Sequence, residues 1–174
     1  MENEFLKLIE TRRSCRKYLP EQITDEELNA VLRAGTFAPT GMGWQSPFIV
    51  AVQQEQMKEK LATMNAAVRG KSGNPYYDAP TYVLVFAPTD CPFAIQDGTC
   101  VLENMMLAAH AIGLASCWIN REIEMFATKE GKQLMKEMGL PEGLGGIGAI
   151  ALGYPATTPA EPKARKEGYA RIIR

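Results

Sequence analysis

The chain has 174 residues, of which 46% are hydrophobic and 22% are charged, and its formal net charge is −1. This length fits one domain, and the hydrophobic content can supply a core that needs no disulfide bonds. The balanced charge excludes a broad basic surface of the kind that binds nucleic acid non-specifically. We therefore expect a single domain over residues 1–174.

Neither a targeting segment nor a metal centre is predicted. The acidic start is not followed by an apolar run, and the most apolar stretch, residues 105–119, is shorter than the roughly 20 residues of a membrane span. We expect a soluble, cytoplasmic protein without nucleic-acid or membrane partners. The four cysteines lack C-x-x-C spacing and His110 is the only histidine, which argues against zinc and against a redox dithiol. We expect His110, Cys100 and Cys117 to be packed in apolar surroundings.

In the first half of the chain, helices surround one strand. Residues 3–10 are expected to form a short helix, and Thr24 with Glu27 gives the capping-box pattern of a second helix that ends near Gly35. Proline and glycine place residues 38–43 in a loop, and residues 48–52 read as a strand. Apolar spacing from Met57 to Val68 predicts a third helix, followed by a flexible loop over residues 69–78.

The second half continues this alternation. The unbroken apolar run over residues 81–86 predicts a buried strand. A long apolar helix is expected over residues 95–113, a short strand over 115–119, a helix over 124–138 and a last strand over 147–152, before a proline-rich tail. Strands buried on both faces require helices above and below the sheet. The sequence therefore predicts a three-layer α/β/α domain.

Two basic segments are candidates for binding an anion. The first is Arg12-Arg13-Ser14-Cys15-Arg16-Lys17, and the second is Pro162-Lys163-Ala164-Arg165-Lys166. Guanidinium groups match the geometry of phosphate, and a serine hydroxyl adds a donor. A solvated basic run has the same composition. RNA binding is a third interpretation, but no array of aromatic residues for base stacking accompanies the cluster.

Two glycine-rich segments are candidates for ligand loops. In Pro39-Thr40-Gly41-Met42-Gly43-Trp44-Gln45-Ser46-Pro47, glycine permits close approach to a flat ligand and Gln45 can donate and accept at a heterocycle edge, although a plain loop is an equal alternative. The run from Gly143 to Gly148 matches G-x-G-x-x-G. That fingerprint needs a strand before it and a helix after it, whereas here a strand and then prolines follow. We expect a flexible turn that enters the last strand.

Taken together, these segments resemble the FMN-dependent nitroreductase family in the same order and over nearly the whole chain. The N-terminal Arg12–Arg16 cluster and the loop Ala38–Gln45 resemble its first two motifs. Two later regions match as well: Asn104–Ala109 with Gly113–Ile119 resembles the central helix and the following strand, and Ile150–Pro155 with Lys163 and Arg165 resembles the C-terminal motif.

The resemblance implies an α+β fold with a mixed, mainly antiparallel sheet, in an intertwined homodimer with an FMN at each of two interface sites. It implies that the phosphate and ribityl chain are held by Arg12, Arg13, Ser14, Arg16, Lys163 and Arg165. The partner chain would supply Pro39, Thr40 and Gln45, and Ile119 and Asn120 would lie beside the ring, where a backbone N–H can reach N5. The C-terminal extension, about residues 155–174, would pack on the partner or on the flavin site.

The activity that the resemblance implies is hydride transfer from NADH or NADPH through flavin N5 to a nitroaromatic, a quinone or another small acceptor, by a ping-pong mechanism. It requires no catalytic side chain and no metal, because the flavin carries the chemistry. Lys71 and Arg121 are possible cations near the ring. Two positions depart from the family pattern: the family often has asparagine where this chain has Gly43, and Pro-Trp where it has Ser46-Pro47. A flavin-storage protein and a related flavin-modifying or dehalogenating enzyme are alternatives.

Overall fold

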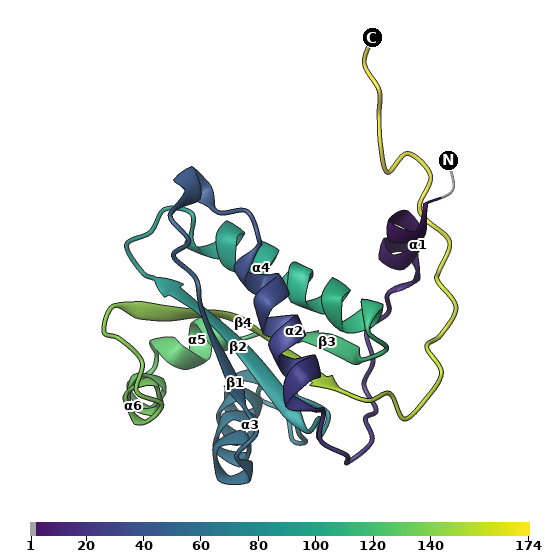
Figure 1. The fold of residues 1–174 in the computed structure, drawn as a ribbon. Coiled ribbons are helices and arrows are strands. Elements are labelled where there is room, and N and C mark those ends of the chain that lie inside the picture. Colours follow the sequence, from purple (N-terminus) through teal and green to yellow (C-terminus); the bar gives the residue numbers. More distant parts are fainter. Residues whose placement is uncertain (1–2) are drawn as a thin grey trace.

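The computed structural model describes residues 3–174 and places a four-stranded sheet between two layers of helices (Figure 1). The strands lie in the order β1-β2-β4-β3, with antiparallel pairing throughout. The one parallel pairing in this part of the chain is an isolated bridge between Ser14 and Ser116. The predicted three-layer fold is confirmed. The strands are β1 (Phe48–Val52), β2 (Thr81–Pro88), β3 (Ala115–Ile119) and β4 (Leu144–Gly153).

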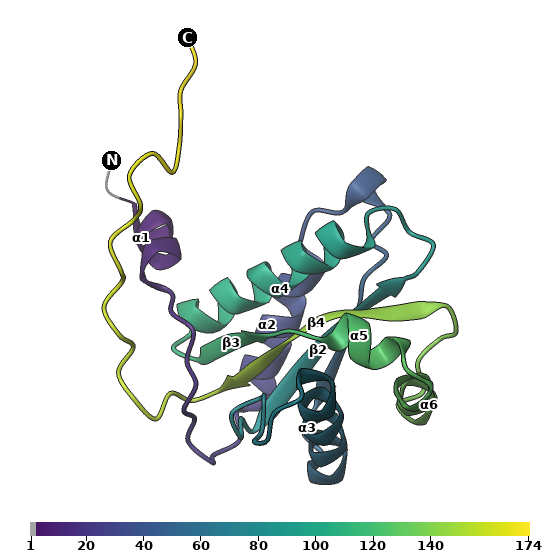
Figure 2. The same cartoon turned by 180° about the vertical axis from the view of Figure 1, so that it is seen from behind.

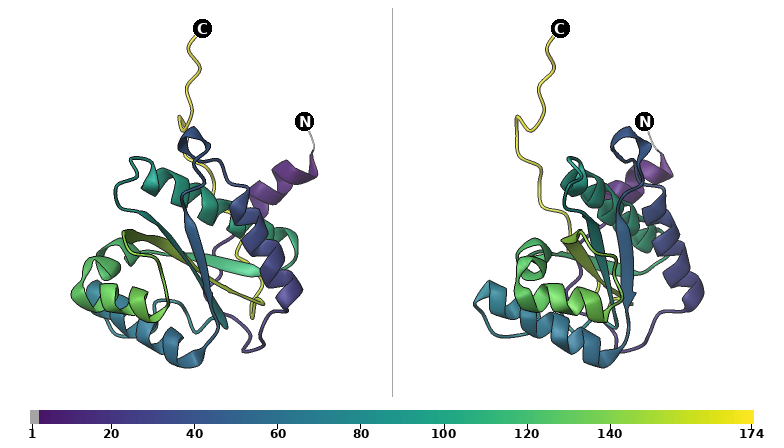
Figure 3. Two further views of the ribbon diagram at one scale, coloured as in Figure 1. Left: turned by 60° about the vertical axis from the view of Figure 1, so that its left-hand side comes forward. Right: turned by 90° about the vertical axis from the view of Figure 1, so that its left-hand side faces the viewer.

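Helices cover both faces of the sheet. On one face lie α2 (Asp25–Thr36) and α4 (Ala94–Ala111), and on the other lie α3 (Glu55–Arg69), α5 (Glu122–Ala127) and α6 (Lys129–Glu137) (Figure 3). The short helix α1 (Glu4–Thr11) lies outside this sandwich, beside one end of α4, and the tail after β4 runs past it and away from the body (Figures 1 and 2). A 3-10 turn, η1 (Gly41–Gly43), precedes β1.

Alternation along β2 divides its side chains between two cores. Val83 and Val85 pack with α2 and α4, while Leu84 and Phe86 pack with α3, α5 and α6. All four side chains are fully buried because β2 and β4 occupy the centre of the sheet. This explains why the strand reads as a continuous apolar run.

The predicted element over residues 124–138 was wrong, since the structure has two helices there. Thr128 separates them in an extended conformation, with ψ at 163°, and its Oγ accepts from the N–H of Gly131 at 2.9 Å. Thr128 is thus the N-cap of α6, a role for which threonine is favoured. The other boundaries agree to within a few residues, and the capping box of Thr24 and Glu27 is present.

Two other local expectations also need correction. Residues 74–79 are not a free loop, because the Asn74 side chain accepts from the Tyr76 N–H at 2.9 Å and Tyr76 is fully buried. The run from Gly143 to Gly148 lies mostly inside β4 and not in a turn before it. Cys117 is buried as expected, whereas Cys100 is half-buried.

The glycines of β4 allow helices to lie directly on the strand. A Cβ atom at Gly146 would collide with the backbone oxygen of Glu122 and with the Phe126 ring, both from α5. On the other face, Gly98 of α4 lies so close to Ile147 that a Cβ there would come within 2.7 Å of the Ile147 side chain. Close packing of α5 therefore accounts for Gly146, and Gly148 faces Leu102 of α4 in a similar way, at 2.9 Å from where its Cβ would lie.

We expect Gly146→Ala to lower the free energy of unfolding by about 1–3 kcal/mol, the usual cost of overpacking a well-packed site. The matched control is Gly145→Ala, whose Cβ would meet only the Thr89 methyl group, at 3.0 Å. Urea denaturation of both variants measures the difference. Equal losses would show that α5 does not rest on β4 as described.

Candidate functional site

Two basic segments from opposite ends of the chain meet in one cavity. It is lined by Arg12, Arg13, Ser14, Arg16, Lys163 and Arg165, among others. Arg12 Nη1 and Arg13 Nε are buried without a hydrogen-bond partner within residues 3–174. Buried donors almost always have an acceptor, and charged ones are costly without it. Arg12 Nε also lies 4.0 Å from a carboxylate oxygen of Glu103. The two basic segments that the sequence analysis selected thus lie around one cavity.

The N-terminal side of this basic cavity is held by backbone contacts. Arg13 Nη1 donates to the carbonyl of Glu10 at 2.7 Å, and the Cys15 N–H donates to the Ser116 carbonyl on β3 at 3.0 Å. Nearby, His110 Nε2 lies 3.0 Å from Thr11 Oγ1 and so joins the end of α1 to α4. Partial burial, together with the charges of Arg12 and Arg13, lowers the pKa of His110. This histidine thus has a packing role.

Arg16 connects the basic cavity to two adjacent tyrosines. Its Nε donates to the Tyr77 hydroxyl at 3.3 Å, and this bond raises the pKa of Arg16. Tyr76, the preceding residue, points into the core and donates to Glu122 Oε1 at 2.9 Å. Tyr77 has a positive φ of 57°, which costs energy for a residue other than glycine. The turn is held in this conformation by contacts on both sides.

The predicted loop Pro39–Gln45 lies at the opposite end of α4 from the basic cavity. The Gly41 N–H donates to Asp97 Oδ1 at 2.9 Å, in the first turn of α4. The contact with His110 is in the last turn of the same helix. At 1.5 Å per residue these two contacts are about 20 Å apart. One chain therefore does not bring Pro39, Thr40 and Gln45 to its own basic cavity.

The predicted ring-binding residues lie at the end of β3, with Ile119 as its last residue and Asn120 directly after it. Ile119 is buried, whereas Asn120 is exposed, and Asn120 Oδ1 accepts from Trp118 Nε1 at 2.8 Å. From Ser116 to Asn120 the strand advances about 13 Å. Ser116 pairs with the basic segment, so the basic cavity and the end of β3 could hold two ends of an elongated ligand. Of the two possible cations near a ring, Arg121 adjoins Asn120, and Lys71 is exposed in the loop after α3.

Behind the end of β3 lies a buried polar cluster that the sequence analysis missed. Glu122 is fully buried, and its Oε1 accepts from the Tyr76 hydroxyl and from Asn65 Nδ2, at 2.9 and 3.1 Å. Its Oε2 has no partner among the described residues. Burial raises the pKa of Glu122 to about 7. The local sequence does not distinguish Glu122 from the exposed Glu124, since both lie in the first turn of α5.

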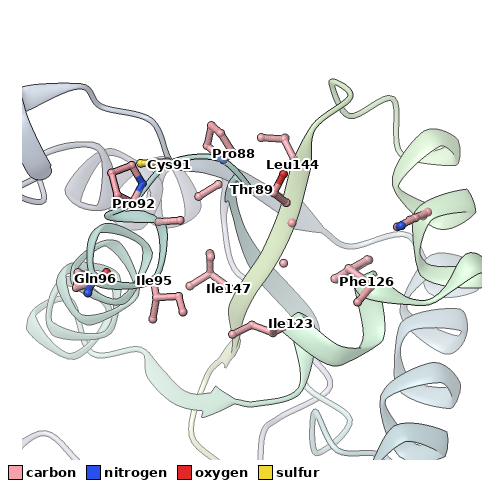
Figure 4. A pocket seen from close by; sticks show the side chains of 16 residues that line it. Pro88, Thr89, Cys91, Pro92, Ile95, Gln96, Ile123, Phe126, Leu144 and Ile147 are labelled. Atoms are coloured by element: carbon pink, nitrogen blue, oxygen red, sulfur yellow. The ribbon is translucent and has the colours of Figure 1, made fainter.

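A separate apolar pocket opens between α5 and the start of α4 (Figure 4). Its volume is about 510 Å³. Apolar side chains dominate the lining, which includes Pro88, Ile95, Ile123, Phe126, Leu144 and Ile147. None of the sequence-predicted site residues belongs to it. The pocket is thus distinct from the basic cavity and has no cluster of ionisable groups for chemistry.

Comparison with known proteins agrees with the fold. The model of the nitroreductase family matches residues 9–154. A nitroreductase with bound FMN from Bacteroides fragilis is 34% identical, with a TM-score of 0.90 over 99% of this chain and 100% of that chain. One from Desulfitobacterium hafniense, also with FMN, is 26% identical with a TM-score of 0.90 over both complete chains. The NADPH-flavin oxidoreductase of Vibrio harveyi is 26% identical over 90% of this chain and 68% of its own length.

The chain therefore belongs to the nitroreductase family. The part of the chain that the structure describes contains no group of three or more histidine, cysteine, aspartate or glutamate side chains arranged to bind a metal. Over the same residues, every helix is too short or too polar to cross a membrane.

We expect ionisation of Glu122 to destabilise the protein as the pH rises. The folded-state pKa of about 7 exceeds the ordinary value of 4.5, so the proton's stabilising contribution is complete below about pH 4.5 and lost by about pH 7. This difference corresponds to roughly 3 kcal/mol. In urea titrations across this range, the free energy of unfolding of Glu122→Gln should rise by that amount relative to wild type as the pH increases. The contribution of His110 to the pH dependence is the same in both proteins and cancels in the difference. Parallel pH dependences would contradict the assignment.

Proposed function

We propose that the chain forms a homodimer with two FMN sites and passes reducing equivalents from NADH or NADPH to a small organic acceptor. Its general class, an NAD(P)H-dependent flavin oxidoreductase with FMN as cofactor, follows from its membership of the nitroreductase family and from its FMN-bound relatives. The observation that carries the proposal is the basic cavity, which brings arginine and lysine side chains from both ends of the chain together: Arg12, Arg13, Arg16, Lys163 and Arg165.

The residues present fit the parts of FMN. The phosphate would be held by Arg12, Arg13 and Arg16 with Ser14, and by Lys163 and Arg165 of the tail. Each charge-assisted hydrogen bond of this kind contributes about 1.5–3 kcal/mol. Ile119 and Asn120, at the end of β3, would lie beside the ring. The distance along β3 from the basic segment supports this division.

The second half of each site would come from the partner chain. Pro39, Thr40 and Gln45 lie about 20 Å from the basic cavity of their own chain, at the other end of α4. The C-terminal tail leaves the body (Figure 2), and Tyr169, Ile172 and Ile173 on it are strongly exposed. Exposed apolar side chains of this kind are typical of an interface. Both features support an intertwined dimer, in which the tail of each chain packs on the other chain.

When bound, FMN would supply the redox chemistry that couples oxidation of a reduced nicotinamide to reduction of a nitroaromatic, quinone or similar acceptor. The protein's part is to bind and orient. The arginines fix the phosphate end, and the segment after β3 offers backbone groups to the ring. His110, the only histidine, is engaged with Thr11, so no general acid or base is assigned to it.

We expect Arg12→Ala to weaken FMN binding by about 2 kcal/mol, roughly thirtyfold, because a charge-assisted contact to phosphate is lost. Riboflavin, which lacks the phosphate, should bind wild type and variant alike. Fluorescence titration with both ligands measures this difference. Arg33→Ala, on the exposed surface of α2, is the control and should bind FMN as wild type does. Normal FMN affinity in Arg12→Ala would remove Arg12 from the phosphate site.

We expect a mixed dimer of Arg12→Ala and Gln45→Ala chains to regain one intact FMN site. If each site takes Arg12 from one chain and Gln45 from the other, the mixed dimer has one doubly altered site and one unaltered site. Tagged chains purified as the heterodimer and titrated with FMN should show half of the sites at wild-type affinity. If every site is weakened, both residues belong to a site within one chain.

A further inference from the structure

A buried cluster of three polar side chains supports the segment that follows β3. Glu122, Tyr76 and Asn65 are 0%, 0% and 1% exposed, and they come from α5, from the turn before β2 and from α3. Glu122 Oε1 accepts from both of the others. None of the ion pairs within residues 3–174 involves Glu122. Burying such a group is costly, and so its retention calls for an explanation.

The cluster fixes the orientation of one exposed peptide group. Asn65 Nδ2 also donates to the carbonyl of Asn120, at 2.8 Å. A trans peptide is planar, with its C=O and N–H pointing in opposite directions. Because the Asn120 carbonyl faces the buried Asn65, the Arg121 N–H faces the other way. It donates to no acceptor within the described part of the chain.

The same peptide is held in an unfavourable conformation. Arg121 has φ at 87°, in the left-handed region that residues other than glycine avoid. Such a conformation costs on the order of 1–3 kcal/mol and persists only when neighbouring contacts hold it. The bond from Asn65 to Asn120 is one such contact. A strained, outward-facing and unpaired N–H is a feature of binding sites, where the donor is kept ready for an acceptor on a ligand.

We propose that Glu122, with Asn65 and Tyr76, is a positioning residue that holds the Arg121 N–H toward an acceptor atom of the flavin ring. This inference rests on the proposed function, since it concerns the ring end of the same site. The adjacent Tyr77 contacts Arg16 of the basic cavity. The turn that carries both tyrosines therefore contacts both ends of the proposed flavin site: Tyr76 binds Glu122 at the ring end, and Tyr77 binds Arg16 at the phosphate end.

The cluster also makes the ring environment sensitive to pH. The ionisable groups that act on Glu122 are Tyr76, from the facing turn, and Glu124, from its own helix. Burial keeps the pKa of Tyr76 well above its ordinary value, so its hydroxyl stays protonated, and Glu124 adds only negative charge. Ionised Glu122 is thus a buried negative charge without a cation. Such a charge near the ring opposes the addition of electrons.

The first test is ring affinity in the full-length dimer. Asn65→Ala should raise the dissociation constants of both FMN and riboflavin by about tenfold, the effect of roughly one hydrogen bond. Arg12→Ala, by contrast, should affect FMN alone. Circular dichroism checks that each variant is folded. If wild type binds no flavin, the proposed function fails. If wild type binds flavin and a folded Asn65→Ala binds FMN and riboflavin as tightly as wild type does, this inference alone is overturned.

The second test does not depend on the Asn65 variant. The midpoint potential of bound FMN is measured from about pH 5.5 to about pH 8 in wild type, Glu122→Gln and Glu124→Gln, the last being the exposed control on the same helix. As the pH rises through this range, the midpoint potential of wild type should become progressively more negative than that of Glu122→Gln, because only wild type acquires the buried charge. Glu124→Gln should follow wild type. If the midpoint potentials of wild type and Glu122→Gln coincide at every pH, Glu122 does not act on the ring and the inference is overturned.

Discussion

The rigid helix α4 sets the distance between the two halves of the candidate site. Its inner face is fixed to the sheet by buried side chains, among them Leu102 and Met105. Its first turn holds the Gly41 loop through Asp97, and its last turn holds the end of α1 through His110. A packed helix of this length cannot bend enough to bring its ends together. The separation of the Gly41 loop from the basic cavity within one chain follows from this one element, and the dimer proposed above would place the two beside each other.

The two ends of the proposed site differ in their electrostatics. At one end, arginine and lysine side chains from both ends of the chain line a basic cavity. At the other end, behind the segment after β3, the structure buries a carboxylate without a cation. The first arrangement suits a charged phosphate and the second suits a neutral ring. The turn containing Tyr76 and Tyr77 contacts both ends.

Much of the fold could be predicted because its signals are local. The capping box of Thr24 and Glu27 depends on residues three apart, and the apolar run of β2 reflects burial on both faces. The break at Thr128 was missed because the cost of one threonine inside a helix is small, below about 1 kcal/mol, so its presence alone does not end a helix. Gly146 of β4 is explained only by α5, which lies directly on it. Such contacts have no local signature.

The candidate site could be predicted in part for the same reason. Clustered arginines signal an anion site by their chemistry, and the structure brings Arg12, Arg13 and Arg16 to Lys163 and Arg165. Glu122, Asn65 and Tyr76 lie far apart in sequence and meet only after folding, so no spacing rule connects them. Which chain supplies Gln45 is likewise a matter of tertiary geometry.

A crystal structure of the protein with FMN tests the central claim most directly. The account predicts that the phosphate accepts hydrogen bonds from Arg12 Nη1 and Arg13 Nε of one chain, the two donors that are unpaired here. It also predicts that the ring of the same FMN lies beside Asn120 of that chain and Gln45 of the partner. A phosphate bound away from the arginine cluster, or an FMN held entirely within one chain, would contradict it.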